Sequence, residues 1–268
     1  MSQVSRLAIR VRGDRAELAL ASLLPLLAAG AEERAVGGDV EYVLYGRSGE
    51  LPAASLVEDA LGDMLVGCSV EAVEPGWERR WHEFLRPVTV GPVTVRPPWV
   101  DGAADDLVID PDLYFGAGSH ATTQLALELL LAEPTRGGAL CDWGAGCGVL
   151  AVAAARLGWD PVSAVEVEPG ALDVIRRNAA ANGVRVSAVG LDLAREPAPW
   201  APTVVVNVPA PLLRALPRVV ERPPERLLIA GMLAAEAGDV VREFAPLGLR
   251  EDARLVAGEW AGLRLVRG

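Results

Sequence analysis

The sequence lacks the patterns that mark several classes of protein. Its three cysteines, Cys68, Cys141 and Cys147, are too few and too scattered for a disulfide framework or a zinc site, and we expect no bound metal. No apolar run approaches the roughly 20 residues that a bilayer span requires. The first residues show no basic segment leading into an apolar core, so we expect no secretion signal and a cytoplasmic protein.

Lysine is absent, and a GC-rich coding sequence explains why all 25 basic residues are arginines. The 36 acidic residues outnumber them and give a net charge of −11. Because a phosphate backbone needs a basic surface, we expect no direct nucleic-acid partner. An acidic chain instead suits a basic protein partner through electrostatic steering. We expect a monomer with no membrane partner.

Residues 1–75 alternate between strand-like and helix-like patterns. Strand patterns fall at 7–11, 35–36, 39–45 and 66–73, and helical patterns at 14–27 and 52–61. Asp14 and Pro52 are residues expected at helix starts. This order predicts a small ferredoxin-like α+β domain. Residues 76–100 then predict a linker helix, followed by short entry strands between prolines.

From residue 101 to 268 the pattern is α/β throughout. Helical patterns fall at 122–131, 149–157, 169–181, 211–220 and 234–244, and strand patterns at 139–143, 162–167, 184–189, 203–206, 227–230, 251–256 and 262–266. The run at 203–206 is almost purely β-branched, as expected of a buried parallel strand. The alternation predicts a Rossmann-like, doubly wound and mostly parallel sheet with an antiparallel C-terminal edge.

A glycine turn follows the first strand of this domain, at Asp142-Trp143-Gly144-Ala145-Gly146-Cys147-Gly148. The next strand ends at Glu166, roughly 20 positions after the first glycine, where an acid can accept hydrogen bonds from a ribose. A dinucleotide fingerprint has its third glycine where this chain has Val149. The spacing G-x-G-x-G therefore favours S-adenosylmethionine. The alternatives are an ordinary tight turn, and Glu168 as the acid.

Two further patches follow the same logic. Residues 110–123 form a glycine-rich segment before a helix, and the backbone amides of this segment can bind an anion. Taken alone it is a loop of unknown purpose, in which His120 can be structural and Thr122 or Thr123 can cap the helix. Asn207 follows a buried strand, where its side-chain oxygen can accept a hydrogen bond from an amine. Its alternative role is also a helix cap.

Together these patches resemble a known family, the ribosomal protein L11 methyltransferases (PrmA). The family pattern W-x-x-x-W…P is matched by Trp77, Trp81 and Pro87, followed by Pro98-Trp99. Its signature D-P-G-x-A-F-G-T-G-x-H-x-T-T is matched by residues 110–123, with Asp110, Pro111, Phe115, Gly116, Gly118, His120, Thr122 and Thr123 kept. The departures are Asp112, Tyr114 and Ala117 in the loop, Val208-Pro209 after Asn207, and Glu166 where aspartate is usual.

The resemblance implies a class I methyltransferase that uses S-adenosylmethionine. It implies that Thr123, Gly144, Glu166 and Asn207 contact the cofactor or its immediate surroundings. We assign the rest of the cofactor site to Phe115, Gly116, Gly118, His120, Thr122, Asp142, Gly146 and Gly148. The N-terminal domain is expected to recognise the ribosomal protein, and the linker to let the catalytic domain reach several amines.

We therefore expect direct methyl transfer to lysine or N-terminal amines of a large-subunit ribosomal protein. Asn207 would orient the attacking nitrogen, and the sequence identifies no general base. One alternative is the same chemistry on another protein lysine or on a glutamine amide, because Asn207-Val208-Pro209 half-resembles the N-P-P-Y loop of amide methyltransferases. Another is a non-catalytic module that binds the cofactor or an assembling ribosome.

Overall fold

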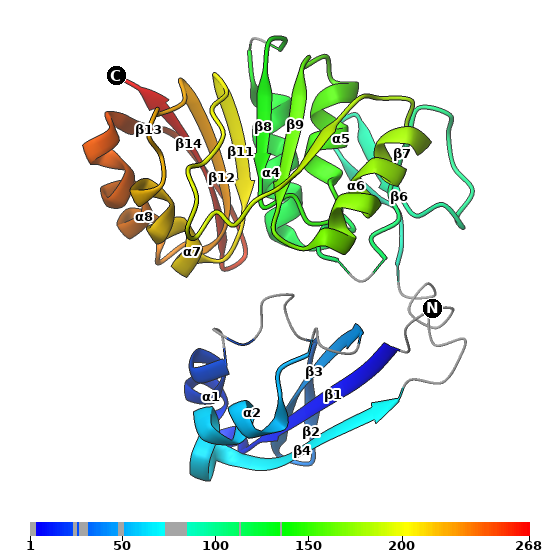
Figure 1. Cartoon of the computed structure of the whole chain (residues 1–268), viewed down its shortest axis with the longest axis vertical. Coiled ribbons are helices and arrows are strands. Elements are labelled where there is room, and N and C mark those ends of the chain that lie inside the picture. The colour runs from blue at the N-terminus through cyan, green and yellow to red at the C-terminus, as the bar shows by residue number, and fades with distance from the viewer. Residues whose placement is uncertain are drawn as a thin grey trace. The chain divides into compact units, whose positions relative to one another are not determined.

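The computed structural model of the chain describes residues 4–23, 26, 32–47, 51–72, 85–112, 114–134 and 136–268. Contacts divide the chain into two compact units, Met1–Glu83 and Phe84–Gly268, which are described separately (Figure 1). The linker helix predicted for residues 76–85 lies, except for its last residue, outside the described residues. No helix among the described residues combines the length and apolar character needed to cross a bilayer.

The N-terminal unit is a four-stranded antiparallel sheet with two helices. The sheet order is β2-β3-β1-β4. The elements are β1 (Val4–Val11), α1 (Ala16–Leu23), β2 (Glu32–Val36), β3 (Asp39–Arg47), α2 (Ala54–Leu61) and β4 (Leu65–Ala72). Alternate residues of β1, namely Leu7, Ile9 and Val11, are buried in one apolar cluster with residues of both helices. The predicted ferredoxin-like arrangement is thus present. The predicted helix start at Pro52 is wrong, because Ala53 takes the N-cap position.

The C-terminal unit is built on a seven-stranded sheet with the order β10-β9-β8-β11-β12-β14-β13. Its strands are β8 (Leu140–Trp143), β9 (Val162–Glu166), β10 (Ser187–Gly190), β11 (Thr203–Asn207), β12 (Arg226–Leu233), β13 (Leu249–Ala257) and β14 (Trp260–Arg267). The first five strands in this order are parallel to one another. Strand β14 pairs antiparallel with both of its neighbours, β12 and β13. The predicted doubly wound sheet with an antiparallel edge is confirmed. Strand order reverses between β8 and β11, where ligands of such sheets bind.

Helices cover both faces of this sheet (Figure 1). They are α4 (Ala121–Ala132), α5 (Val149–Arg156), α6 (Pro169–Ala181), α7 (Ala210–Ala215) and α8 (Ala237–Phe244). Side chains of β11 alternate between the two cores: Val205 packs with the cluster that contains α4 and α5, whereas Val204 and Val206 pack with that of α7 and α8. Burial on both faces explains the β-branched run in this strand.

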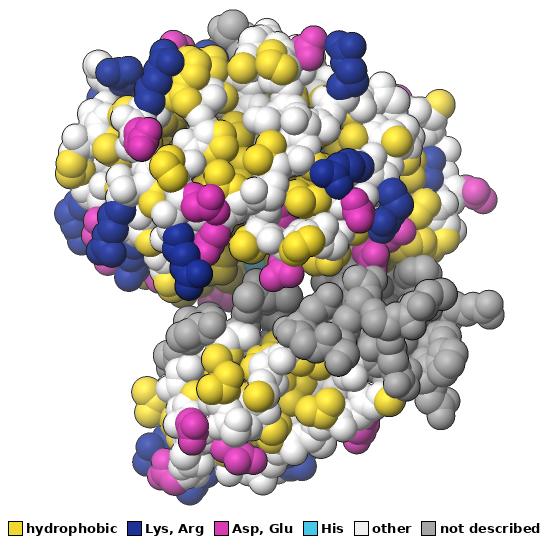
Figure 2. Space-filling view, in the orientation of Figure 1, with side chains coloured by type: hydrophobic (Ala, Val, Ile, Leu, Met, Phe, Trp, Pro, Cys, Tyr) yellow, Lys and Arg dark blue, Asp and Glu magenta, His cyan; other side chains and the backbone are white. Residues whose placement is uncertain are grey.

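A small three-stranded sheet supports the loop before α4. It consists of β5 (Val88–Val90), β6 (Val93–Arg96) and β7 (Leu107–Val108). Arg96 braces it by an ion pair of 3.0 Å to Asp106 and a hydrogen bond of 2.7 Å to the carbonyl of Val100. On the face in Figure 2, basic and acidic side chains of the described residues are interspersed among apolar ones.

Candidate functional site

The glycine turn after β8 is pressed against the neighbouring strand β9. The amides of Gly144 and Ala145 both donate to the carbonyl of Val165, at 2.9 and 3.0 Å. Gly146 has a φ of +55°, and a Cβ there would lie 2.6 Å from the carbonyl oxygen of Phe115. The turn therefore requires glycine, because an L side chain would be strained and would collide with backbone.

Glu166 at the end of β9 is bound to this turn. Its Oε2 accepts from the amide of Gly146 at 2.9 Å, and its Oε1 accepts from the amide of Val167 at 2.8 Å. Backbone donors thus fix both carboxylate oxygens at the carboxyl edge of the sheet. Glu168 is exposed at the N-cap of α6, where its side chain makes no capping hydrogen bond. The structure places Glu166, rather than Glu168, at the turn.

Asp142 supports the turn from inside the protein. The side chain is fully buried, and its Oδ2 accepts from the amide of Ala151 in α5 at 3.0 Å. Its Oδ1 is buried without a hydrogen-bond partner among the described residues. Burial above all, opposed by the hydrogen bond from Ala151 and helped by the nearby Glu166, raises the pKa of Asp142 to about 7. Asp142 therefore couples β8 to the start of α5.

Replacing Asp142 with asparagine should change how stability depends on pH. The folded pKa of about 7 lies above the ordinary value of 3.8, so the folded state keeps a proton that the unfolded chain releases. Stability from this group is therefore lost as pH rises through about 4 to 7. An asparagine oxygen can still accept from Ala151 and does not titrate. The Tm of Asp142→Asn, measured without cofactor, should therefore rise relative to that of the wild type as pH increases from about 4 to 7. A pH-independent offset would contradict this.

Two asparagines at the C-terminal end of α6, Asn178 and the C-cap residue Asn182, hold the segment before α4. Asn178 donates from Nδ2 to the carbonyls of Asp110 and Cys147, both at 2.9 Å, and accepts from the amide of Asp110 at 3.0 Å. Asn182 exchanges hydrogen bonds of 2.9 and 2.7 Å with the backbone of Val108. Sequence reasoning missed both residues. Their i, i+4 spacing on a helix was the available signal, because it places two polar side chains on one face.

The glycine-rich loop lies directly on the glycine turn. The amide of Cys147 donates to the carbonyl of Phe115 at 3.1 Å. Gly116 and Gly118 have φ values of +112° and +93°, and added Cβ atoms would lie 3.0 Å from Cys147 Sγ and 3.3 Å from Val95 Cβ. Burial raises the pKa of the Cys147 thiol to about 12, so this side chain is a small neutral packing group.

His120 forms the N-cap of α4. Thr122 donates its amide to His120 Nδ1 at 3.3 Å, and the Thr122 hydroxyl lies 2.8 Å from the same nitrogen. The expectation that Thr122 or Thr123 caps this helix is wrong, since the imidazole takes that place. Burial lowers the pKa of His120, which favours the neutral ring that capping requires.

Asn207 ends β11 beside the start of α4. Its Nδ2 donates to the hydroxyl of the buried Thr123 at 3.4 Å, so Oδ1 is not used in this contact. Asn207 does not cap α7, because Pro209 holds that position. The loop after Asn207 packs on a bulge in β12, where Gly231 has a φ of +93° and an added Cβ would lie 2.2 Å from the carbonyl oxygen of Val208. Gly231 was not predicted.

Two more residues lie next to Glu166 at this edge of the sheet. Val167 follows it with 53% of its surface exposed. Asp192 follows β10, the strand beside β9, and the amide of the preceding Leu191 donates to the carbonyl of Glu166 at 3.1 Å. Sequence reasoning missed Asp192, although an acid after a strand was the available signal. The Asp192 carboxylate accepts from the amide of Ala194 at 2.9 Å and lies 3.5 Å from Arg195.

The predicted residues of the C-terminal unit thus meet along one edge of the sheet. The glycine turn and Glu166 lie at the ends of β8 and β9, Asn207 lies at the end of β11, and the loop joins them to α4. Trp77 and Trp81 lie outside the described residues. Among the residues that the structure describes, no group of three or more histidine, cysteine or acidic side chains could hold a metal ion.

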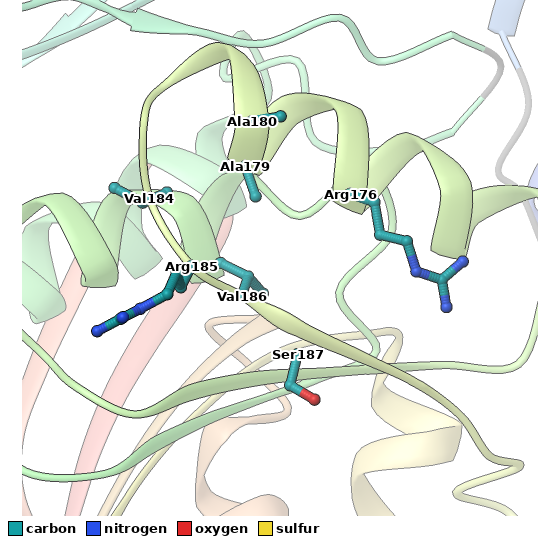
Figure 3. A pocket seen from close by; sticks show the side chains of 7 residues that line it. All are labelled: Arg176, Ala179, Ala180, Val184, Arg185, Val186 and Ser187. Carbon is teal, nitrogen blue, oxygen red and sulfur yellow. The ribbon is translucent and has the colours of Figure 1, made fainter.

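A hollow of about 400 Å³ lies elsewhere, between the C-terminal part of α6 and the start of β10 (Figure 3). Its two arginines, Arg176 and Arg185, point outward and pair with Asp173 and Asp160 at 2.7 and 3.6 Å. Because parallel strands share their direction, the start of β10 is at the opposite edge from Glu166. This hollow is not part of the site.

Comparison with known proteins gives a consistent result. The model of the family "Ribosomal protein L11 methyltransferase (PrmA)" matches residues 56–268. A protein named ribosomal protein L11 methyltransferase from Halorhodospira halophila is 36% identical over 77% of this chain and 73% of its own length. A protein of the same name from Pelotomaculum thermopropionicum is 39% identical over 71% of this chain and 65% of its own length. The crystal structure of a ribosomal protein L11 methylase from Lactobacillus delbrueckii subsp. bulgaricus superposes with a TM-score of 0.61 at 25% identity, over 68% of this chain and 97% of that one.

Proposed function

The chain belongs to the ribosomal protein L11 methyltransferase (PrmA) family, and we propose that it transfers methyl groups from S-adenosylmethionine to lysine or N-terminal amines of ribosomal protein L11. The observation that supports this best is the arrangement at the strand-order reversal. There the Glu166 carboxylate, fixed on the glycine turn, lies one strand beyond β8 on one side, and Asn207 at the end of β11 lies on the other. Such a site can hold a nucleoside beside an attacking nitrogen.

The residues present fit S-adenosylmethionine. Oε1 of Glu166 accepts two backbone hydrogen bonds, from Val167 at 2.8 Å and from Glu168 at 3.3 Å. Oε2 accepts one, from Gly146, and keeps acceptor capacity for a ribose hydroxyl. The glycines at 144, 146 and 148 let a ligand approach the backbone, and the N-terminus of α5 favours the cofactor carboxylate. Val167 and Asp192 would adjoin the adenine. When bound, S-adenosylmethionine supplies a methyl group activated by a positively charged sulfur.

Asn207 performs the positioning on the acceptor side. Its Nδ2 is directed at Thr123, so Oδ1 is the atom that accepts a hydrogen bond from the incoming amine. The amine attacks as a neutral nitrogen, and burial beside a positive charge favours the loss of its proton. His120 is engaged as a helix cap, so we assign it no role as a base. Orientation and exclusion of water are then the main contributions of the protein.

The N-terminal unit is the part we assign to substrate recognition. Its ferredoxin-like fold is a compact unit distinct from the one that contains the seven-stranded sheet. The net charge of −11 favours the encounter with a basic ribosomal protein. We place the reaction in the cytoplasm, where such an acceptor is made, and propose that the chain acts as a monomer.

The test is methylation of purified ribosomal protein L11 from the same organism. Incubation with labelled S-adenosylmethionine should add methyl groups at lysine side chains or the N-terminal amine, located by mass spectrometry of proteolytic fragments. Methylation of a glutamine amide would support the alternative acceptor chemistry instead. The same incubation with a whole-cell extract covers the remaining alternatives. Labelling of a different protein would refute the acceptor, and no labelling despite cofactor binding would favour a non-catalytic module.

A further inference from the structure

Three aromatic rings form a row beside the candidate site. The ring centroids of Phe115 and His120 are 5.2 Å apart at an interplanar angle of 65°. Those of His120 and Trp260 are 4.9 Å apart at 68°. Both contacts are edge-to-face, which is a favourable arrangement for aromatic pairs. The row joins a loop, the start of a helix and the start of the last strand, which are far apart in the sequence.

The position of this row follows from its backbone contacts. At one end, the carbonyl of Phe115 accepts from the glycine turn, at Cys147. In the middle, His120 precedes Thr123 by one helical turn, and Thr123 contacts Asn207. At the other end, Trp260 pairs with Leu233 at the end of β12. The row therefore runs past the carboxyl ends of β8, β11 and β12, on the side where Asn207 lies.

The rings are held in place but are not part of the core. Phe115 has 43% of its surface exposed, and Trp260 is only partly buried. His120 is fixed by its bonds to Thr122. The turn before Trp260 is fixed by a hydrogen bond of 2.8 Å from the amide of Ala234 to the carbonyl of Glu259. Apolar area that is rigid yet accessible is typical of a binding surface.

We propose that Trp260 is an acceptor-binding residue, which forms with His120 and Phe115 an aromatic wall along the path of the acceptor side chain. The wall would contact the aliphatic stem of a lysine and, through cation–π attraction, its ammonium group before transfer and its methylated form after it. The rings suit an alkylamine better than an amide, because a neutral amide gains no such attraction. This inference rests on the proposed function and adds a residue to the same site.

Ligand binding tests the wall without the protein acceptor. In sinefungin, a carbon bearing a primary amine replaces the methylated sulfur, so a cationic group lies where the acceptor arrives. S-Adenosylhomocysteine lacks both the methyl group and the charge. In calorimetry on the full chain, Trp260→Ala should lower the affinity ratio of sinefungin to S-adenosylhomocysteine about tenfold. Trp260→Phe should largely retain the ratio. Trp200→Ala is the matched control, because that exposed tryptophan precedes β11 at the opposite edge of the sheet.

The outcomes separate the two proposals. An unchanged ratio in Trp260→Ala would overturn the wall, as would an equal loss for both ligands, which would indicate general damage to the cofactor site. With ribosomal protein L11 as acceptor and S-adenosylmethionine at saturation, Trp260→Ala should also raise the KM for that protein about tenfold. If the wild type does not methylate that protein but the ligand ratio still falls in Trp260→Ala, the acceptor assignment fails and the wall stands.

Discussion

Glu166→Ala should raise the Kd for S-adenosylmethionine at least about 100-fold in calorimetry. A hydrogen bond to a charged group contributes about 1.5–3 kcal/mol, and 1.4 kcal/mol already corresponds to a tenfold change in Kd. Oε2 of Glu166 accepts one backbone hydrogen bond and keeps acceptor capacity for the ribose. The variant also frees the amide of Gly146, which donates to Glu166 at 2.9 Å in the wild type. Loss of ligand contacts and loss of turn order therefore act in the same direction.

Two variants control for this result. Glu168→Ala removes a carboxylate of equal charge two residues away, exposed at the start of α6, and should leave the Kd within about threefold. Glu166→Gln retains one acceptor oxygen and should lie between the wild type and alanine. If Glu168→Ala had the larger effect, Glu166 would be the wrong acid. If Glu166→Ala had no effect, the nucleoside would not lie at this edge.

Features set by neighbouring residues were predictable from the sequence. Helix α6 was predicted at its observed bounds, Pro169–Ala181, because proline starts helices well and Asn182-Gly183 ends this one. The glycine turn was predictable for the same reason, since its positive φ angles are available to glycine. The sequence therefore predicted the local geometry of the glycine turn and the bounds of α6.

Features set by tertiary contacts were less accessible. Strand β10 was expected from residue 184, but it begins at Ser187, and the amide of Val184 still bonds to Ala179 at the end of α6. The bulge at Gly231 exists because the backbone of Val208 lies against it. Neither periodicity nor local propensity contains such information, because each partner is remote in sequence or belongs to another element.

The row of aromatic rings shows the same limit. The glycine-rich segment 110–123 contains His120, and the sequence offered its neighbours Thr122 and Thr123 as possible helix caps, because hydroxyl side chains often cap helices. The ring took the cap position instead, packed between Phe115 and Trp260. Trp260 is about 140 residues away in the chain, and only the pairing of β14 with β12 brings it to the site. The position of Trp260 beside His120 therefore could not be predicted from the sequence.

Asn207→Ala should lower the rate of methyl transfer at saturating cofactor by at least about 100-fold, because misplacing a reacting group by about 1 Å can cost that much. The alanine variant removes the Oδ1 that orients the amine, and it also removes the bond of 3.4 Å to Thr123. The Kd for S-adenosylmethionine should change only a few-fold, since Glu166 and the glycine turn supply most of that binding. Single-turnover methylation of ribosomal protein L11, monitored by mass spectrometry, measures the rate.

Thr123→Val distinguishes orientation from simple loss of a polar group at Asn207. Valine matches the shape of threonine but cannot accept from Nδ2, so the amide stays present while its anchor is lost, and the rate should fall about tenfold. Asn207→Asp keeps an oxygen in place and should retain more activity than alanine. A rate within about threefold of the wild type in Asn207→Ala would show that the amine is oriented elsewhere. An equal loss of rate and cofactor affinity would move Asn207 from the acceptor to the cofactor side.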